Sequence, residues 1–162
     1  MASASATVEG VALAMPKESF EISGPIDPTK FYPKYGPLPA VVAVREQTGS
    51  WDAVGRTRRL MLSDGGHVIE TIAVVDSPRY FAYNLTEFQQ LFGMLVTDAT
   101  AQWRYDRVAT GTKVTWTYTF RPKRGASLIV AGIVRFWWAP YMKKVLPPIL
   151  REIERRSTMK PA

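Results

Sequence analysis

The chain has 162 residues, of which 46% are hydrophobic and 22% are charged, and these values predict one soluble globular domain. It contains no cysteine and a single histidine, His67, which excludes a disulfide scaffold, a cysteine nucleophile, an iron–sulfur cluster and a zinc or other metal site built from cysteines or several histidines. The net charge is +7, and residues 127–162 carry seven basic against two acidic side chains, so the positive charge is concentrated toward the C-terminus.

The N-terminal part lacks a targeting signal. Residues 1–18 have no basic start and no sustained apolar run, so they predict a weakly ordered lead-in rather than a secretory signal. No stretch approaches the roughly twenty apolar residues of a spanning helix. We therefore expect a cytoplasmic protein.

Period-two alternation predicts seven strands. The first is Ser19–Ser23, and the proline-rich stretch 24–39 after it has room for only a helical turn or two. The other six cover residues 40–47, 56–62, 67–75, 79–85, 100–106 and 113–121. Short turns rich in Gly, Pro, Asp and Ser separate most of them, while Thr86–Val96 is predicted to form a helical turn or an irregular cover. Short turns between consecutive strands favour an antiparallel meander.

The pattern changes to a helical period from Ser127 onward. One apolar face is predicted to contain Leu128, Ala131, Trp138, Met142, Val145, Ile149 and Ile153. Pro140 and Pro147-Pro148 are expected to kink or divide this helix. The fold class is therefore α+β, with a curved antiparallel sheet of about seven strands wrapped on a long C-terminal helix.

Glu70 is a carboxylate on an otherwise apolar strand face. A hairpin register that pairs Leu62 with Val68 places Arg58 one diagonal step from Glu70, within reach of a long side chain. Because an unpaired buried charge is costly, we expect the two to form a buried ion pair. This pair is either structural or a polar anchor for a ligand carbonyl or hydroxyl, and if the protein is an enzyme, Glu70 and Arg58 are the catalytic candidates.

Aromatic side chains share the inner faces of the last three predicted strands. Their positions fit either a filled core or the walls of a ligand cavity, which would measure roughly several hundred Å³. Together with the charged pair and the helix, they give the predicted ligand-binding set: Arg58, Glu70, Phe81, Tyr83, Trp103, Trp116, Tyr118, Trp138 and Met142.

Several short motifs resemble one known superfamily. They are Gly49–Trp51 followed by Gly55–Arg58, then Asp64-Gly65 before Val68–Glu70, Ser77–Tyr83, and Gly111–Trp116. In this order and spacing the chain resembles the START-like (SRPBCC) superfamily, the helix-grip fold of lipid-transfer domains, the birch pollen allergen and polyketide cyclases. The resemblance covers residues 19–157 as a single domain and leaves 158–162 as a tail. It implies an apolar cavity between sheet and C-terminal helix that takes a small hydrophobic ligand, although the stretch 24–39 is shorter than the helical pair often found there.

Three hypotheses about function remain open. The leading one is binding or transport of a small hydrophobic molecule, such as a lipid, polyketide or aromatic metabolite, without catalysis. The second is a polyketide cyclase or aromatase. The third is a peripheral membrane or protein-interaction module, because Phe136–Trp138 followed by Lys143-Lys144 resembles an interfacial pattern. No cofactor and no metal is expected, and no nucleic-acid-binding motif accompanies the charge.

Overall fold

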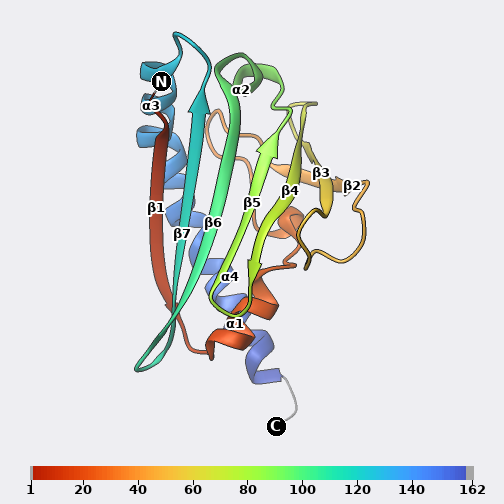
Figure 1. Ribbon diagram of the computed structural model, residues 1–162. Coiled ribbons are helices and arrows are strands. Elements are labelled where there is room, and N and C mark those ends of the chain that lie inside the picture. The colour runs from red at the N-terminus through yellow and green to blue at the C-terminus, as the bar shows by residue number, and fades with distance from the viewer. Residues whose placement is uncertain (1, 160–162) are drawn as a thin grey trace.

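Seven antiparallel strands form one curved sheet in the computed structural model, which describes residues 2–159 (Figure 1). The spatial order is β1-β7-β6-β5-β4-β3-β2, so every strand pair except β1–β7 joins consecutive strands. The strands are β1 Ala4–Ala12, β2 Val41–Arg45, β3 Thr57–Leu62, β4 His67–Asp76, β5 Tyr80–Thr86, β6 Val96–Val108 and β7 Gly111–Pro122. The predicted α+β architecture with an antiparallel meander is confirmed.

The helices lie on one side of this sheet and at its ends (Figure 1). They are α1 Pro16–Ser23, η1 Pro28–Lys30, α2 Gln90–Leu95, α3 Ser127–Ile133, the π-helical turn η2 Val134–Trp138, and α4 Ala139–Met159. None of the helices within residues 2–159 is both long and apolar enough to cross a membrane.

The N-terminal assignments were wrong in two places. Residues Ala4–Ala12 form strand β1, which pairs with β7, whereas a weakly ordered lead-in was expected. Its small side chains weaken the visible alternation, yet Ala6 and Val8 point into the core and Thr7 shares a hydrogen bond of 3.0 Å with Thr117 on the outer face. Strand pairing along the whole of β7 therefore supplies the order that the composition did not suggest.

The second correction concerns residues 19–23, which belong to helix α1 and not to a strand. Pro16 stands at the first helical position, where its missing N–H costs nothing and its fixed φ favours a helix. Phe20 and Ile22 are both buried, and the Ser23 hydroxyl donates back to the Ser19 carbonyl oxygen at 2.7 Å. Five residues are too few to separate the two periods, so the short alternation was misleading.

The C-terminal helix is divided, but not where each proline stands. The break is η2, which ends two residues before Pro140, while α4 continues through Pro147 and Pro148. The predicted buried face holds from Trp138 onward; Leu128 and Ala131, however, are exposed. In α3 the buried residue is Val130, because the first helical stretch has a different facing from α4 once the wider π-helical turn intervenes.

Candidate functional site

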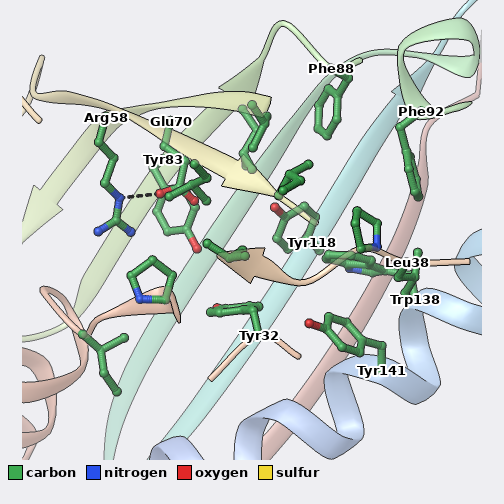
Figure 2. A pocket seen from close by; sticks show the side chains of 18 of the residues that line it. Tyr32, Leu38, Arg58, Glu70, Tyr83, Phe88, Phe92, Tyr118, Trp138 and Tyr141 are labelled. Carbon is green, nitrogen blue, oxygen red and sulfur yellow. Dashed lines mark hydrogen bonds and ion pairs between the residues drawn. The ribbon is translucent and has the colours of Figure 1, made fainter. Parts of the chain in front are cut away.

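A narrow cavity lies between the concave face of the sheet and the helical layer, with a volume of about 100 Å³. Its walls are mostly apolar and aromatic, and they come from the strands of the sheet, from the loops before β2 and α2, and from α4 (Figure 2). Seven of the nine predicted ligand-binding residues line it: Arg58, Glu70, Phe81, Tyr83, Trp103, Tyr118 and Trp138. Trp116 and Met142 are completely buried beside it and belong to the core instead.

The charged pair forms one end of this cavity. Arg58 and Glu70 lie directly opposite each other on β3 and β4, and the Arg58 Nε donates to Glu70 Oε1 at 2.6 Å (Figure 2). The predicted buried ion pair is thus confirmed, with 7% of Arg58 and 4% of Glu70 exposed. The expected register was wrong by two residues, because Leu60 rather than Leu62 pairs with Val68.

Trp51 holds the guanidinium from the other side. The Arg58 Cζ lies 4.1 Å from the centre of the Trp51 ring, a cation–π contact that fixes the plane of the guanidinium. Within residues 2–159 the hydrogen bond to Glu70 is the single one that this guanidinium makes. Since arginine carries five N–H donors, donors remain for another oxygen atom at this end of the cavity.

Three phenols, those of Tyr32, Tyr83 and Tyr118, add further hydrogen-bonding capacity along the cavity (Figure 2). Burial raises the pKa of all three, and the nearby Glu70 carboxylate raises the pKa of each further. Hydrogen bonding with Trp103 and Tyr32 opposes this rise in the pKa of Tyr83 without cancelling it. The phenols therefore stay protonated at neutral pH and serve as hydrogen-bond donors.

Two other tyrosines that line the cavity have structural partners. The Tyr141 hydroxyl donates to the Pro33 carbonyl oxygen at 2.8 Å, and the Tyr105 hydroxyl shares a hydrogen bond of 2.6 Å with Ser23. These bonds tie α4 to the proline-rich loop and β6 to α1. Their phenols are thus already engaged, in contrast to that of Tyr118.

Aromatic packing makes the cavity smaller than the several hundred Å³ expected. The Trp103 and Trp116 rings stack with 4.8 Å between their centres, and the Trp138 ring packs on Tyr118 with 4.7 Å between the ring centres. These rings occupy space that smaller side chains would leave open. Pockets for drug-sized ligands measure roughly 300–1,000 Å³, so a ligand of that size requires some of the walls to move.

The mouth of the cavity lies beside α2. Two of the lining residues are exposed, Asp64 and Gln89. Asp64 lies in the turn between β3 and β4, and Gln89 directly precedes α2. Gln89 fastens the two segments together, because its Oε1 accepts from the backbone N–H of His67 at 3.1 Å. The half-buried Phe92 of α2 also lines the cavity, and its ring stacks on that of Phe120 with 6.0 Å between the ring centres.

Sequence reasoning missed several lining residues. Tyr32 and Leu38 come from the proline-rich stretch, Phe88 and Phe92 from the α2 segment, and Tyr141 from α4. The first four lie outside regular strands, so no strand periodicity predicts that their side chains are oriented toward the cavity. Tyr141 had a usable signal, since it lies three residues after Trp138 on the apolar face of the helix.

The described residues were also considered as metal ligands. Among the described residues, no three His, Asp or Glu side chains gather in a way that could hold a metal ion. The ionisable groups along the cavity are the Glu70 carboxylate, the Arg58 guanidinium and several phenols, with the Asp64 carboxylate at the mouth.

Comparison with protein families gives a match over most of the chain. The model of a family described as "Polyketide cyclase / dehydrase and lipid transport" matches residues 27–154. That segment includes every element from η1 through most of α4, and with it the ion pair and all the residues that line the cavity except Ser23, Gly24 and Ile26. No curated protein matches the chain.

Solved structures of the same fold are similar at low sequence identity. Ara h 8.0201 superposes with a TM-score of 0.61 at 18% identity, over 98% of this chain and 100% of its own. Protein MLL2253 from Mesorhizobium loti gives 0.61 at 13% identity, over 93% and 97%. The di-domain ARO/CYC StfQ from the steffimycin biosynthetic pathway gives 0.68 at 11% identity, over 97% of this chain and 53% of that protein, so this chain spans about half of its length. These matches show the helix-grip fold.

Proposed function

We propose that this chain, which belongs to the polyketide cyclase/dehydrase and lipid-transport family, binds a small hydrophobic molecule that carries a carbonyl or hydroxyl group. Ligand binding is typical of this family. The proposed orientation places the oxygen atom toward Arg58 and the apolar body along the aromatic walls. We further propose that the protein works as a cytoplasmic carrier rather than as a catalyst.

The buried guanidinium is the observation that supports this proposal most strongly. Arg58 is held rigidly between Glu70 and Trp51, yet it has N–H donors left over at the end of an apolar cavity. A carbonyl or hydroxyl oxygen can accept from such donors without adding a charge to the cavity. An oxygen-bearing ligand thus gains more from this site than a pure hydrocarbon does.

The dimensions restrict the ligand further. A cavity of about 100 Å³ between stacked rings favours a flat, compact molecule over a long branched one. Aromatic walls such as Trp103 and Phe81 provide faces and edges for ring stacking. Fused-ring metabolites and short polyketides meet both requirements.

A matched ligand pair tests the proposal directly. Naphthol and naphthalene share a flat apolar body, and only naphthol has a hydroxyl group. Titration calorimetry should show naphthol binding about tenfold more tightly, which corresponds to one hydrogen bond to a charged donor. Native mass spectrometry of freshly purified protein should also reveal a co-purified molecule of this class.

The control variants separate the polar end from general effects. Arg58→Met combined with Glu70→Leu should remove the preference for naphthol, whereas Arg79→Met on the exposed Asp76 pair should leave it unchanged. Equal binding of both ligands to the wild-type protein, or no binding of either, would contradict the proposal.

Cyclase or aromatase activity is a second candidate function. Glu70 and the phenols of Tyr83 and Tyr118 border the same cavity, which is an arrangement suited to acid–base chemistry on a poly-carbonyl chain. Similarity to the ARO/CYC StfQ is compatible with the hypothesis of cyclase or aromatase activity. In such a reaction the Glu70 carboxylate takes a proton from a carbon between two carbonyls, the enolate attacks a ketone of the same chain, and a phenol protonates the new alkoxide.

The ion pair makes this second candidate the weaker one. The only hydrogen bond that Glu70 forms within the described residues is the one to the Arg58 guanidinium, which neutralises the charge that a base would use. The discriminating experiment incubates a synthetic poly-β-ketone thioester with wild-type protein and with Glu70→Gln. Cyclisation that is faster with wild-type protein than with the variant would favour an enzyme.

A further inference from the structure

Four large apolar side chains are exposed at one end of the molecule. Leu91 and Met94 on α2 are 52% and 74% exposed, and Leu128 and Ile129 on α3 are 89% and 56% exposed. We call these four residues the apolar tip. Single exposed apolar residues are ordinary, but two helices that both present them at the same end of the fold require an explanation.

The two helices of the apolar tip are connected through the loop that leads into α3. The loop from β7 to α3 is fastened to α2, because the backbone N–H of Lys123 donates to the Leu95 carbonyl oxygen at 2.8 Å. The Lys123 ammonium also donates to the carbonyl oxygen of Gly93 at 2.5 Å. Figure 1 shows α2 and α3 at the same end of the sheet, opposite the β6–β7 turn.

Unpaired positive charges surround the apolar tip. Residues 121–151 contain seven Lys and Arg side chains and no Asp or Glu. Arg121 is paired with Asp98, but within residues 2–159 none of the other six forms an ion pair. Three of them are close to the tip in the chain and exposed: Lys123 and Arg124 lie in the loop before α3, and Arg135 lies in η2 directly after it. We call these three residues the basic collar.

We propose that the apolar tip and basic collar dock on the surface of a lipid bilayer that contains anionic headgroups. Leu91, Met94, Leu128 and Ile129 enter the boundary between headgroups and acyl chains, and the basic collar contacts lipid phosphates. Exposed apolar residues flanked by Lys and Arg are the combination that interfacial binding needs.

Charge favours this occupant over two others. A second copy of the chain would bring two basic collars together, which like-charge repulsion disfavours in a protein of net charge +7. Nucleic acid would satisfy the cations but would leave Leu128 and Met94 without an apolar partner. An anionic bilayer satisfies both kinds of residue at once.

The apolar tip also adjoins the mouth of the cavity. Leu91 and Met94 are exposed on the same short helix whose Phe92 lines the cavity. Docking would therefore bring that opening against the bilayer, where an apolar ligand could pass without crossing water. This consequence rests on the proposed ligand-binding function, whereas the docking itself does not.

Vesicle co-sedimentation tests the docking with the whole protein. Wild-type protein should pellet with phosphatidylcholine vesicles that contain one-third phosphatidylglycerol and should stay in solution with phosphatidylcholine alone. Replacing two collar residues, Arg124→Gln with Arg135→Gln, should weaken binding by about fivefold per cation lost. Leu128→Ser with Ile129→Ser, which changes only exposed side chains, should weaken binding at least tenfold at unchanged net charge.

Matched substitutions at the opposite end control for non-specific attraction. Leu13→Ser removes a side chain that is 63% exposed, and Arg107→Gln removes a cation from the end of β6. Neither should change vesicle binding. The proposal is overturned if wild-type protein fails to pellet, if these controls weaken binding as much as the tip variants, or if the tip variants instead abolish a dimer in solution. Arg58→Met with Glu70→Leu should still pellet, which keeps this test independent of ligand binding.

Discussion

Arg58 and Glu70 face each other across β3 and β4, and their side chains meet at 2.6 Å with less than a tenth of either residue exposed. Direct cross-strand neighbours need little extension to touch, so both side chains stay ordered. Because each charge neutralises the other in an environment shielded from water, the pair behaves as one unit. Loss of one member leaves the other without compensation.

Glu70→Gln should lower the free energy of unfolding by roughly 1–3 kcal/mol, since Arg58 keeps its charge but loses its carboxylate. Chemical denaturation at neutral pH measures this change. Asp76→Asn is the matched control, because Asp76 pairs with Arg79 at 3.2 Å on the surface and exposed pairs contribute little. If both variants unfold like the wild type, Arg58 has found another partner and the pair is not a unit.

Replacing both members should cost less than replacing one. We expect Arg58→Met with Glu70→Leu to unfold within about 1 kcal/mol of the wild type, because apolar side chains of similar size restore packing without a buried charge. A double-mutant cycle with the two single variants then gives the coupling energy. Additive effects would mean that the two side chains stabilise the fold independently.

Much of the sheet could be predicted from the sequence. The alternation in β7 placed Trp116 and Tyr118 inward and the intervening threonines outward, as the structure has them. The ion pair was predicted even though the register was wrong by two residues. A register error of two residues keeps every side chain on the same face of its strand. Arg58 and Glu70 were therefore correctly predicted as partners, although they lie directly opposite each other and not one diagonal step apart.

Features that depend on packing between elements could not be predicted. β1 consists largely of small residues and owes its order to nine paired positions along β7. The outward facing of Leu128 depends on the π-helical turn that separates α3 from α4. The small cavity results from the stacking of Trp103 on Trp116. The strand pattern predicts that both rings share one face of the sheet, but it does not predict the distance between them.

The phenol of Tyr118 should influence stability at alkaline pH. Burial raises its pKa above the ordinary value near 10, so the unfolded chain loses this proton at a lower pH than the folded chain does. The protonated phenol makes its full contribution to the free energy of unfolding below about pH 10. This contribution decreases as the pH rises toward the pKa in the folded state, because ionisation then favours the unfolded state. Tyr118→Phe should reduce the loss of unfolding free energy between pH 9 and 11, by up to about 1.4 kcal/mol per pH unit above the unfolded pKa.

Tyr80→Phe, on a half-buried tyrosine outside the cavity, is the control for that measurement. Phenolate absorbance should show Tyr118 ionising only when the protein unfolds. If Tyr118→Phe and the wild type lose stability in parallel above pH 10, water reaches the phenol in the folded state.

The segment around α2 should open when a ligand enters. Glu87 and Gln90 have φ values of 60° and 55°, which non-glycine residues seldom adopt, so this short helix is held by its contacts rather than by its backbone preference.

In hydrogen-exchange mass spectrometry, peptides covering residues 86–96 should exchange faster than those of β7. Saturation with naphthol should slow them severalfold, because a filled cavity gives Phe92 an additional packing surface, while residues 4–12 of β1, which lie outside the cavity lining, stay unchanged. Phe92→Ala should speed ligand association in stopped-flow experiments, and Met94→Ala, on the exposed side of the same helix, should not. Binding without any response in residues 86–96 would place the entrance elsewhere, at the proline-rich stretch 24–39.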